Sequence, residues 1–453
     1  MFTGAACWLI VSSLLGLIAS IKFHSPTFLA DCSWMTYGRV HPAATNALLY
    51  GFAVQSGLAV LLWVFARQGG TPLIHPFLIG GAAKIWNLGV LLGIAGIIRG
   101  SGSGFENLEM PRYAVCFLFA SYLVIALVAT ITLHHRKERD LQPSQWFLFA
   151  ALLWFPWIYS TANLLLLKFQ VRGVTQAIIA WWFSANLITV WLALIGIAAL
   201  FCIVPKLVKR PLYSSHYALF AFWTLLLFGT WTGVPFGAPT PAWMPAMSAV
   251  ATLMLIIPAI AVAKNICGTI KGDCVALKSN PAGLFVQFAV PAFLLSTLMH
   301  CAASLPCLNA ITNMTWFTVA QTHLQVYGFY AMSIFAAFYY LAPHVSGFAI
   351  SAKFAKLHFI LMALGVAVLV IPLAIAGIAQ GLKLNDPSIP AVDVAKGTIP
   401  FLRAATTGEL LILLGNVAFF ANIAGLATLF AKKQFALCCA DDSCDAKIAE
   451  VKA

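Results

Sequence analysis

Twelve apolar segments, each long enough to cross a lipid bilayer as an α-helix, constrain this chain more than any other feature. About 20 apolar residues span the hydrocarbon core of a membrane. The segments that meet this requirement are 6–22, 44–66, 74–98, 113–133, 146–167, 175–204, 215–235, 242–263, 283–303, 316–342, 356–380 and 405–431. Of the 453 residues, 62% are hydrophobic and 9% are charged, whereas about 25% are charged in soluble domains. We predict an all-α polytopic membrane protein with a twelve-helix bundle, and exclude a water-soluble enzyme.

The net charge of +13 is explained by membrane topology and does not indicate a nucleic-acid partner. Most Lys and Arg residues lie in the connections after even-numbered segments and in the C-terminal tail. Cytoplasmic loops of membrane proteins are enriched in these residues, so we expect both termini to be cytoplasmic. The chain divides into one membrane domain, 1–435, and a polar tail, 436–453, which contains Cys438, Cys439 and Cys444. The longest connection is expected at 381–404.

Two charged residues lie inside the apolar segments. They are Lys84 in the third segment and Glu409, expected about one turn into the last segment. Charge within a membrane is costly and usually faces protein or water. Either Glu409 takes part in a proton path, or the two residues are neutralised by packing or by pairing with each other.

Histidine is the most informative polar residue type in this sequence. Only His323 lies clearly inside an apolar segment, whereas His358 and most others are expected at segment ends or in loops. His41 precedes the second segment. Two histidines at similar depth on different helices can bind a heme iron from its two sides. His41 and His323 are predicted on the same side of the membrane, so they are the plausible pair.

Several short motifs occur in order along the second to tenth segments. They are Gly38-Arg39-Val40-His41-Pro42, Trp86-Asn87-Leu88-Gly89-Val90, Glu109-Met110-Pro111-Arg112-Tyr113, Trp154-Phe155-Pro156-Trp157, Gln321-Thr322-His323-Leu324 and Tyr339-Tyr340-Leu341-Ala342-Pro343. In this order they resemble the catalytic subunit of C-family heme-copper oxidases, the cytochrome cbb-type terminal oxidases. The resemblance implies the twelve-helix fold of that family and a place in a bacterial cytoplasmic membrane.

The resemblance also implies positions for two hemes and one copper ion, and most of these positions carry residues that do not bind metal. The low-spin heme positions fall on Ala44 and His323, and the high-spin heme position falls on Gln321. The copper positions fall on Ala185, Pro235 and Phe236, and the redox tyrosine falls on Gly229. We therefore expect no copper and no high-spin heme, with Phe236, Trp231 and Trp182 filling the former cofactor volume.

The preferred hypothesis is a non-catalytic subunit I-like membrane protein of a respiratory electron-transfer complex. Its partners would be other membrane subunits and c-type cytochromes. The alternative is a b-type cytochrome that relays electrons through one heme b held by His41 and His323, with Arg39 pairing with a heme propionate. A membrane transporter is a further alternative. Because the oxygen-reducing centre is degenerate, the sequence leaves enzymatic activity open.

Overall fold

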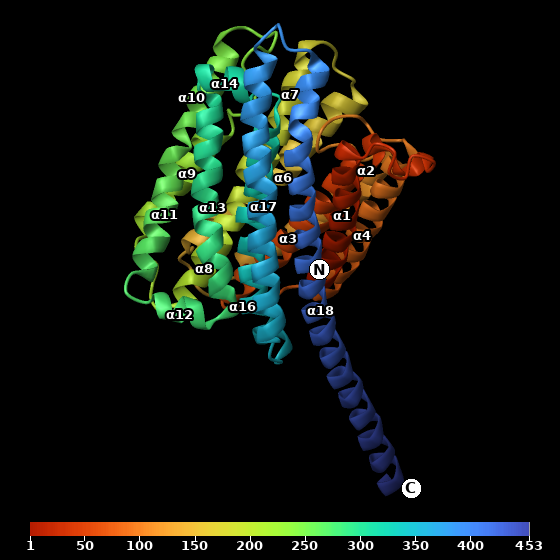
Figure 1. Ribbon diagram of the computed structural model, residues 1–453. Coiled ribbons are helices and arrows are strands. Elements are labelled where there is room, and N and C mark those ends of the chain that lie inside the picture. The colour runs from red at the N-terminus through yellow and green to blue at the C-terminus, as the bar shows by residue number, and fades with distance from the viewer. Residues whose placement is uncertain (453) are drawn as a thin grey trace.

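Long helices packed side by side make up the computed structural model (Figure 1), as expected for a chain whose backbone polar groups must be satisfied inside lipid. The structure describes the backbone of residues 1–452 and their side chains, except those of 274, 276, 279 and 434–452. Within these residues there is no strand, and eleven helices are long and apolar enough to cross a membrane. The prediction of an all-α polytopic membrane protein is confirmed.

The elements follow one another with short connections. In chain order they are α1 (Phe2–His24), η1 (Ser33–Met35), α2 (Tyr37–Asn46), η2 (Ala47–Val54), α3 (Gln55–Gln68), α4 (Pro76–Arg99), α5 (Arg112–His134), α6 (Pro143–Ala162), η3 (Asn163–Lys168), α7 (Val174–Ala185), η4 (Asn186–Trp191), α8 (Leu192–Leu207), α9 (Ser215–Gly229), α10 (Trp243–Met254), α11 (Ile256–Ile270), α12 (Cys274–Ser279), α13 (Pro281–Ser304), α14 (Pro306–Thr312), α15 (Trp316–His323), η5 (Leu324–Ala331), α16 (Met332–Ser346), α17 (Ala352–Leu384) and α18 (Ala391–Lys452). The segments η2 to η5 are π-helical turns inside longer helices, and η1 is a 3-10 turn.

Two expected boundaries are wrong. The segment expected at 215–235 ends at Gly229, so α9 has 15 residues and is shorter than the other spans. Pro235, Pro239 and Pro241 follow it, and proline residues cannot continue a regular helix. The expected connection at 381–404 shrinks to 385–390, because α17 continues to Leu384 and α18 already begins at Ala391.

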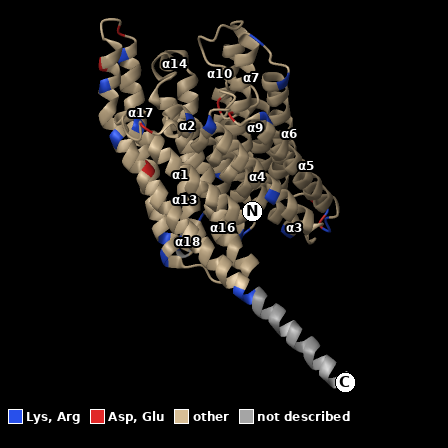
Figure 2. Cartoon of the chain, turned by 90° about the vertical axis from the view of Figure 1, so that its right-hand side faces the viewer, with Lys and Arg blue, Asp and Glu red and all other residues tan. Residues whose placement is uncertain are grey.

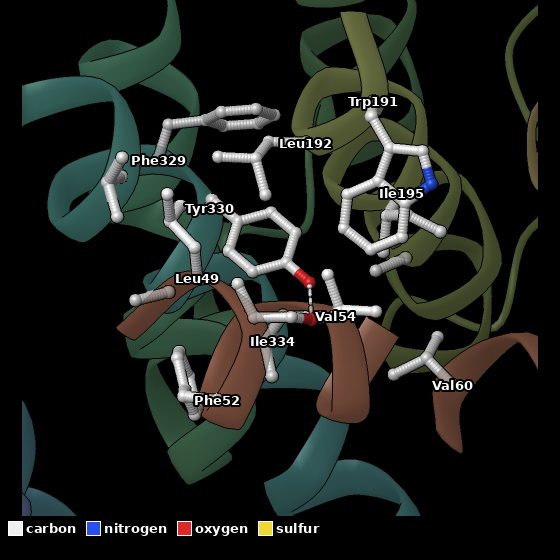
Figure 3. Close-up of a cluster of buried hydrophobic side chains, with 14 of the residues drawn as sticks. Leu49, Phe52, Val54, Val60, Trp191, Leu192, Ile195, Phe329, Tyr330 and Ile334 are labelled. Carbon is white, nitrogen blue, oxygen red and sulfur yellow. Dashed lines mark hydrogen bonds between the residues drawn. The ribbon is translucent and has the colours of Figure 1, made fainter. Parts of the chain in front are cut away.

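Three membrane-spanning helices are interrupted near their middle by a π-helical segment. The segments η2, η4 and η5 lie in the spans Tyr37–Gln68, Val174–Leu207 and Trp316–Ser346, which are also the most buried spans of the bundle. Their side chains interlock around Tyr330, whose hydroxyl donates to the Ala53 carbonyl at 2.6 Å (Figure 3). The bond satisfies a carbonyl in η2 and holds that segment against η5. Such π-helical turns often mark functional sites.

The first and last helices of the bundle lie side by side, although they are far apart in the sequence (Figure 1). α18 also packs along α17. Gly365 on α17 and Gly408 on α18 allow a close approach, because a Cβ on Gly408 would lie 2.9 Å from the Gly365 carbonyl oxygen. Small residues commonly bring membrane helices together in this way.

Charged side chains gather towards the two ends of the bundle, and its middle is mostly uncharged (Figure 2). The two intramembrane charges differ from this pattern in different ways. Lys84 is exposed on the outside of the bundle, whereas Glu409 is buried and its Oε2 atom has no hydrogen-bond partner. The pairing of these two residues, which the sequence left open, is therefore not present. Glu409 also lies 18 residues into α18, well beyond the expected first turn.

Candidate functional site

The structure brings together the two histidines expected to form a heme-binding pair. His41 lies in the first turns of α2 and His323 is the last residue of α15, just before η5. Phe23 joins the elements that carry them, because it contacts both Tyr37 beside His41 and Trp316 on the helix of His323. The His41 ring is exposed and the His323 ring is partly buried. Binding of a heme by this pair stays a prediction.

Aromatic rings occupy the space around this pair. The Tyr37 ring stacks on His41 with centroids 5.2 Å apart, and Phe23 contacts Tyr37 at 4.6 Å and Trp316 at 4.7 Å. The Tyr327 ring stacks on His323 at 5.8 Å. Aromatic pairs with this spacing add stabilisation beyond the area that they bury. The pair is thus set in a cluster of rings formed by α1, α2, α15 and η5.

The Arg39 guanidinium is held by neighbouring backbone and is not free to turn towards the two histidines. Its Nη1 donates to the Ser33 carbonyl at 2.9 Å, and a Cβ added to Gly100 would lie 3.2 Å from Nη2. The guanidinium therefore holds η1 and the end of α4 together. A propionate would have to share this guanidinium with the Ser33 carbonyl.

The Ala44 position is closed by hydrogen bonding and packing. Ala44 is 6% exposed, and its carbonyl accepts a hydrogen bond from the Ser12 hydroxyl at 2.9 Å. A methyl side chain offers no metal ligand. If iron were held here, His41, three residues earlier on α2, would have to replace it.

The positions expected for copper also converge, although they come from distant parts of the sequence. Ala185 ends α7, and a Cβ added to Gly233 would lie only 2.6 Å from the Ala185 Cβ. Pro235 and Phe236 follow Gly233 in the same loop. At the tyrosine position, a Cβ on Gly229 would lie 2.9 Å from Val190 Cγ2. The backbone of this loop thus packs against α7 and η4 and leaves no room for larger side chains.

Amide side chains connect the same region to α15. Gln321 Nε2 donates to Gln325 Oε1 at 3.1 Å, and Gln325 Nε2 donates to the Ile188 carbonyl at 2.9 Å. Ile188 lies in η4, just after Ala185. The high-spin heme position therefore takes part in a hydrogen-bonded chain between two helices. A neutral amide in this role serves packing and polarity, and amides are poor iron ligands.

Asn186 fixes the neighbouring helices around this region. Its Oδ1 accepts from Trp154 Nε1 at 3.2 Å, and its Nδ2 donates to the carbonyls of Trp182 at 2.9 Å and Thr230 at 3.4 Å. Trp182 and Phe236 are partly buried here. Trp231, in contrast, is 57% exposed. The expectation that Trp231 fills the former cofactor volume is therefore wrong, because the end of α9 turns this ring outward.

A loop between α4 and α5 covers this side of the bundle. Tyr50 donates to the Asn107 carbonyl at 2.6 Å, and Asn107 Nδ2 donates to the Ser184 hydroxyl at 2.6 Å. Asn46 Nδ2 donates to Glu109 Oε2 at 2.7 Å. Burial raises the pKa of the Glu109 carboxyl to about 7, against the hydrogen bond from Asn46, which lowers it. The motif Glu109–Tyr113 pointed to this loop, but its role in joining α2, η2 and α7 was not expected.

One buried histidine lies elsewhere and was expected at a helix end. His358 is fully buried in α17, where its Nδ1 lies 3.0 Å from the Tyr339 hydroxyl and its Nε2 has no hydrogen-bond partner. Phe335 and Phe419 pack against its ring at 4.4 and 5.0 Å. α17 begins at Ala352, so His358 lies inside the helix and under its neighbours. Among the side chains that the structure describes, no group of three or more His, Cys, Asp or Glu residues could hold a metal ion.

Comparison with known proteins decides the family. The model of the family described as "Cytochrome C and Quinol oxidase polypeptide I" matches residues 1–411. The chain belongs to the subunit I family of heme-copper oxidases. The cbb3-type cytochrome c oxidase subunit CcoN1 of Stutzerimonas stutzeri is 26% identical over 433 residues, which cover 93% of this chain and 90% of that protein.

Two further comparisons agree with the assignment of this chain to the subunit I family. The cytochrome c oxidase subunit 1 homolog of Azorhizobium caulinodans is 24% identical over 437 residues, which cover 92% of this chain and 79% of that protein. The structure of a heme-copper terminal oxidase dimer, determined by cryo-electron microscopy, has a TM-score of 0.68 at 15% identity over 93% of this chain and 83% of that one. The predicted family resemblance and fold are confirmed.

At the positions that the family resemblance implies for copper and for a second heme, the described side chains are not metal ligands. The Ala185 methyl lies against Gly233, with 2.6 Å between its Cβ and a Cβ added to Gly233. At the high-spin heme position, the Gln321 amide bonds to Gln325. His41 and His323 have side chains that can act as axial heme ligands.

Proposed function

We propose that this protein is a non-catalytic subunit I homologue that supports the assembly of a respiratory electron-transfer complex. The observation that carries the proposal is that Ala185 packs against Gly233 and Gln321 is bonded to Gln325, which in turn bonds to Ile188, so these expected ligand positions carry no metal-binding side chain. Reduction of oxygen in this fold would require a copper ion held by imidazoles and a heme ligand at position 321. The packing of this region supports a structural role.

The retained fold supports binding to other membrane subunits. The relatives are named as subunits of cytochrome c oxidases. Exposed aromatic and aliphatic side chains cover the outer faces of several helices, among them Trp223, Leu227 and Phe220 on α9. Lipid or another membrane helix can cover such a face. We propose other membrane subunits and c-type cytochromes as partners, in a bacterial cytoplasmic membrane with both termini in the cytoplasm.

The test is purification of the protein from its native membrane in mild detergent. We expect no copper by metal analysis, no oxygen consumption with reduced cytochrome c, and co-purification of other respiratory subunits at a fixed ratio. A preparation that contains copper and two hemes and reduces oxygen would refute the proposal. A monodisperse protein without partners would refute the assembly role.

A second candidate function is electron relay through a single heme b, and the cluster of rings that joins the elements of His41 and His323 favours it. In this case the two imidazoles would bind the iron, and the bound heme would accept and donate single electrons. The surrounding rings of Tyr37 and Tyr327 would orient the imidazoles.

A reduced-minus-oxidised spectrum with a pyridine hemochrome assay separates the two candidates. Electron relay predicts one heme b per chain, lost in both His41→Ala and His323→Ala. His344→Ala is the matched control, because His344 is exposed at the end of α16 and bonds only to the Tyr340 carbonyl. A heme that survives both substitutions would refute these ligands. A folded protein without heme, made with heme available, would favour the structural role alone.

A further inference from the structure

A polar seam runs between α1 and α18 through an otherwise apolar interface. We call it the α1–α18 seam. On α1 it consists of Ser13, Gly16, Ser20 and His24, and on α18 of Thr406, Glu409 and Asn416. These residues recur every three or four positions on α1, so they lie on one face of that helix. The spacing lets the side chains of the two antiparallel helices meet in successive layers.

The layers are joined by hydrogen bonds on both sides of Glu409. Towards the end of α1, the hydroxyls of Ser20 and Thr406 are 2.7 Å apart, and His24 Nε2 is 3.1 Å from Thr406 Oγ1. In the other direction, Asn416 Nδ2 donates to Ser13 Oγ at 2.8 Å. Between them, Glu409 lies against Gly16, where an added Cβ would be 3.8 Å from Glu409 Oε2.

Glu409 is the only one of these residues that carries an acid. Its side chain is 6% exposed and its Oε2 atom has no hydrogen-bond partner. A buried carboxylate without a cation is so costly that such a group normally binds a proton. An acid at this depth in a membrane helix is by default a functional residue, and its usual role is in proton transfer.

The position of Glu409 along α18 favours proton exchange with one face of the membrane. At 1.5 Å per residue, Glu409 lies about 9 Å from Arg403 and about 34 Å from Lys432 along α18. We define the His24 face as the membrane face at which α1 ends and α18 begins. The short route from Glu409 to water leads to this face, along Thr406, Ser20 and His24.

Few titratable groups surround Glu409. On α1 the nearest are His24 and Lys22, and on α18 it is Arg403, all towards the His24 face. η5 carries two tyrosines, Tyr327 and Tyr330. α17 carries no titratable residue between His358 and Lys383. The negative charge of Glu409 would therefore lack a nearby compensating cation.

We propose that Glu409 is a proton-exchange site supplied from the His24 face through the α1–α18 seam. A proton enters at His24, passes along the hydroxyls of Thr406 and Ser20, and binds the Glu409 carboxylate, and it leaves by the same route in reverse. Thr406 and Glu409 are three residues apart on one helix, a separation of about 5–6 Å between Cβ atoms, which one water molecule or a side-chain rotation bridges.

Labelling with N,N′-dicyclohexylcarbodiimide tests this proposal, since the reagent modifies protonated carboxyls in apolar surroundings. The protein is reconstituted in sealed vesicles and sorted by protease access to a C-terminal tag. The pH is then set independently on the two sides, and the modified Glu409 peptide is measured by mass spectrometry. We expect the labelling rate to follow the pH on the His24 face only, and to vanish in Glu409→Gln.

A double variant on the proposed proton route and a control variant beside it test that route. The double variant Ser20→Ala, Thr406→Val is expected to slow the response to a pH step at least tenfold. Thr407→Val is the matched control, because Thr407 is the neighbouring residue, is exposed, and bonds only to the Ala404 carbonyl. Labelling that follows the pH on the opposite face, or a double variant that responds like Thr407→Val, would overturn the proposal.

Infrared spectroscopy covers the case in which the reagent fails to reach the site. We expect a pH-dependent carboxyl C=O band that shifts on exchange into deuterium oxide and is missing in Glu409→Gln. If the protein shows neither this band nor labelling, the proposal is wrong.

Discussion

Replacing Gly408 with alanine should weaken the contact between α17 and α18 and destabilise the whole bundle. A Cβ at this position would lie 2.6 Å from the Leu369 backbone nitrogen and 2.9 Å from the Gly365 carbonyl oxygen. Both neighbours are backbone atoms, so no side-chain rotation can relieve the overlap. The two helices must separate, and neighbouring side chains lose their packing.

The magnitude follows from known costs of overpacking. Forcing one methyl group into a close-packed interface costs about 1–3 kcal/mol, and contact with backbone atoms places Gly408→Ala near the upper end. Gly425→Ala on the same helix is the matched control, since an added Cβ would meet nothing within 4 Å. In the control, the helix propensity of alanine contributes up to about 1 kcal/mol of stabilisation. We therefore expect the variants to differ by roughly 3 kcal/mol, about a hundredfold in the unfolding equilibrium constant.

Unfolding in mixed micelles with increasing sodium dodecyl sulfate, followed by circular dichroism, measures this difference. Gly408→Ala should unfold at a clearly lower detergent fraction than the wild type and Gly425→Ala. If Gly408→Ala and Gly425→Ala unfold within 1 kcal/mol of each other, the interface is looser than described, and the argument from backbone contact fails.

Three further predictions concern polar groups. Burial raises the pKa of the Glu109 carboxyl from its ordinary range to about 7, so the buried acid favours folding below the unfolded-state pKa and loses this advantage as the pH rises through 7. Glu109→Gln should abolish this dependence of thermal stability between pH 5.5 and 8.5, which covers about 1.5 units below the folded-state pKa and at 1.36 kcal/mol per unit is worth roughly 2 kcal/mol; an unchanged pH profile would contradict it. Tyr339→Phe leaves the buried His358 without its hydrogen-bond partner and should cost about 1–3 kcal/mol in the same micelle assay, whereas no loss would show that the bond contributes little. Asn186→Ala frees the Trp154 indole and should shift its fluorescence emission and lower the melting temperature by several degrees; an unchanged spectrum would mean that this bond does not form.

The amino-acid sequence determined the fold class and the family, because both depend on patterns that every member of the fold must carry. Long apolar runs can cross a bilayer only as helices or strands with internally paired backbones, and here their length requires helices. The motifs around His41, Trp154 and His323 were sufficient to indicate the subunit I fold. The residue identities at Ala44, Ala185 and Gln321 can likewise be read without coordinates, and they are the reason that we expect ligands to be missing.

Only the tertiary structure decided how these positions relate to one another. The contact of Ala185 with Gly233 and the amide chain from Gln321 to Ile188 join residues more than 40 positions apart, so no local pattern could predict them. The residues at which helices begin and end were also known only from the tertiary structure. The extension of α18 back to Ala391 placed Glu409 18 residues into the helix, where the sequence had suggested the first turn.

Burial is the physical reason for this division. Hydropathy reports whether a segment prefers lipid or protein to water, but a buried face and a lipid-facing face are equally apolar. The sequence therefore could not distinguish exposed Trp231 from the buried Trp191, or exposed Lys84 from buried Glu409. Whether such a side chain is exposed or buried depends on which helices are neighbours. The packing of α1 against α18 buries Glu409 in the α1–α18 seam.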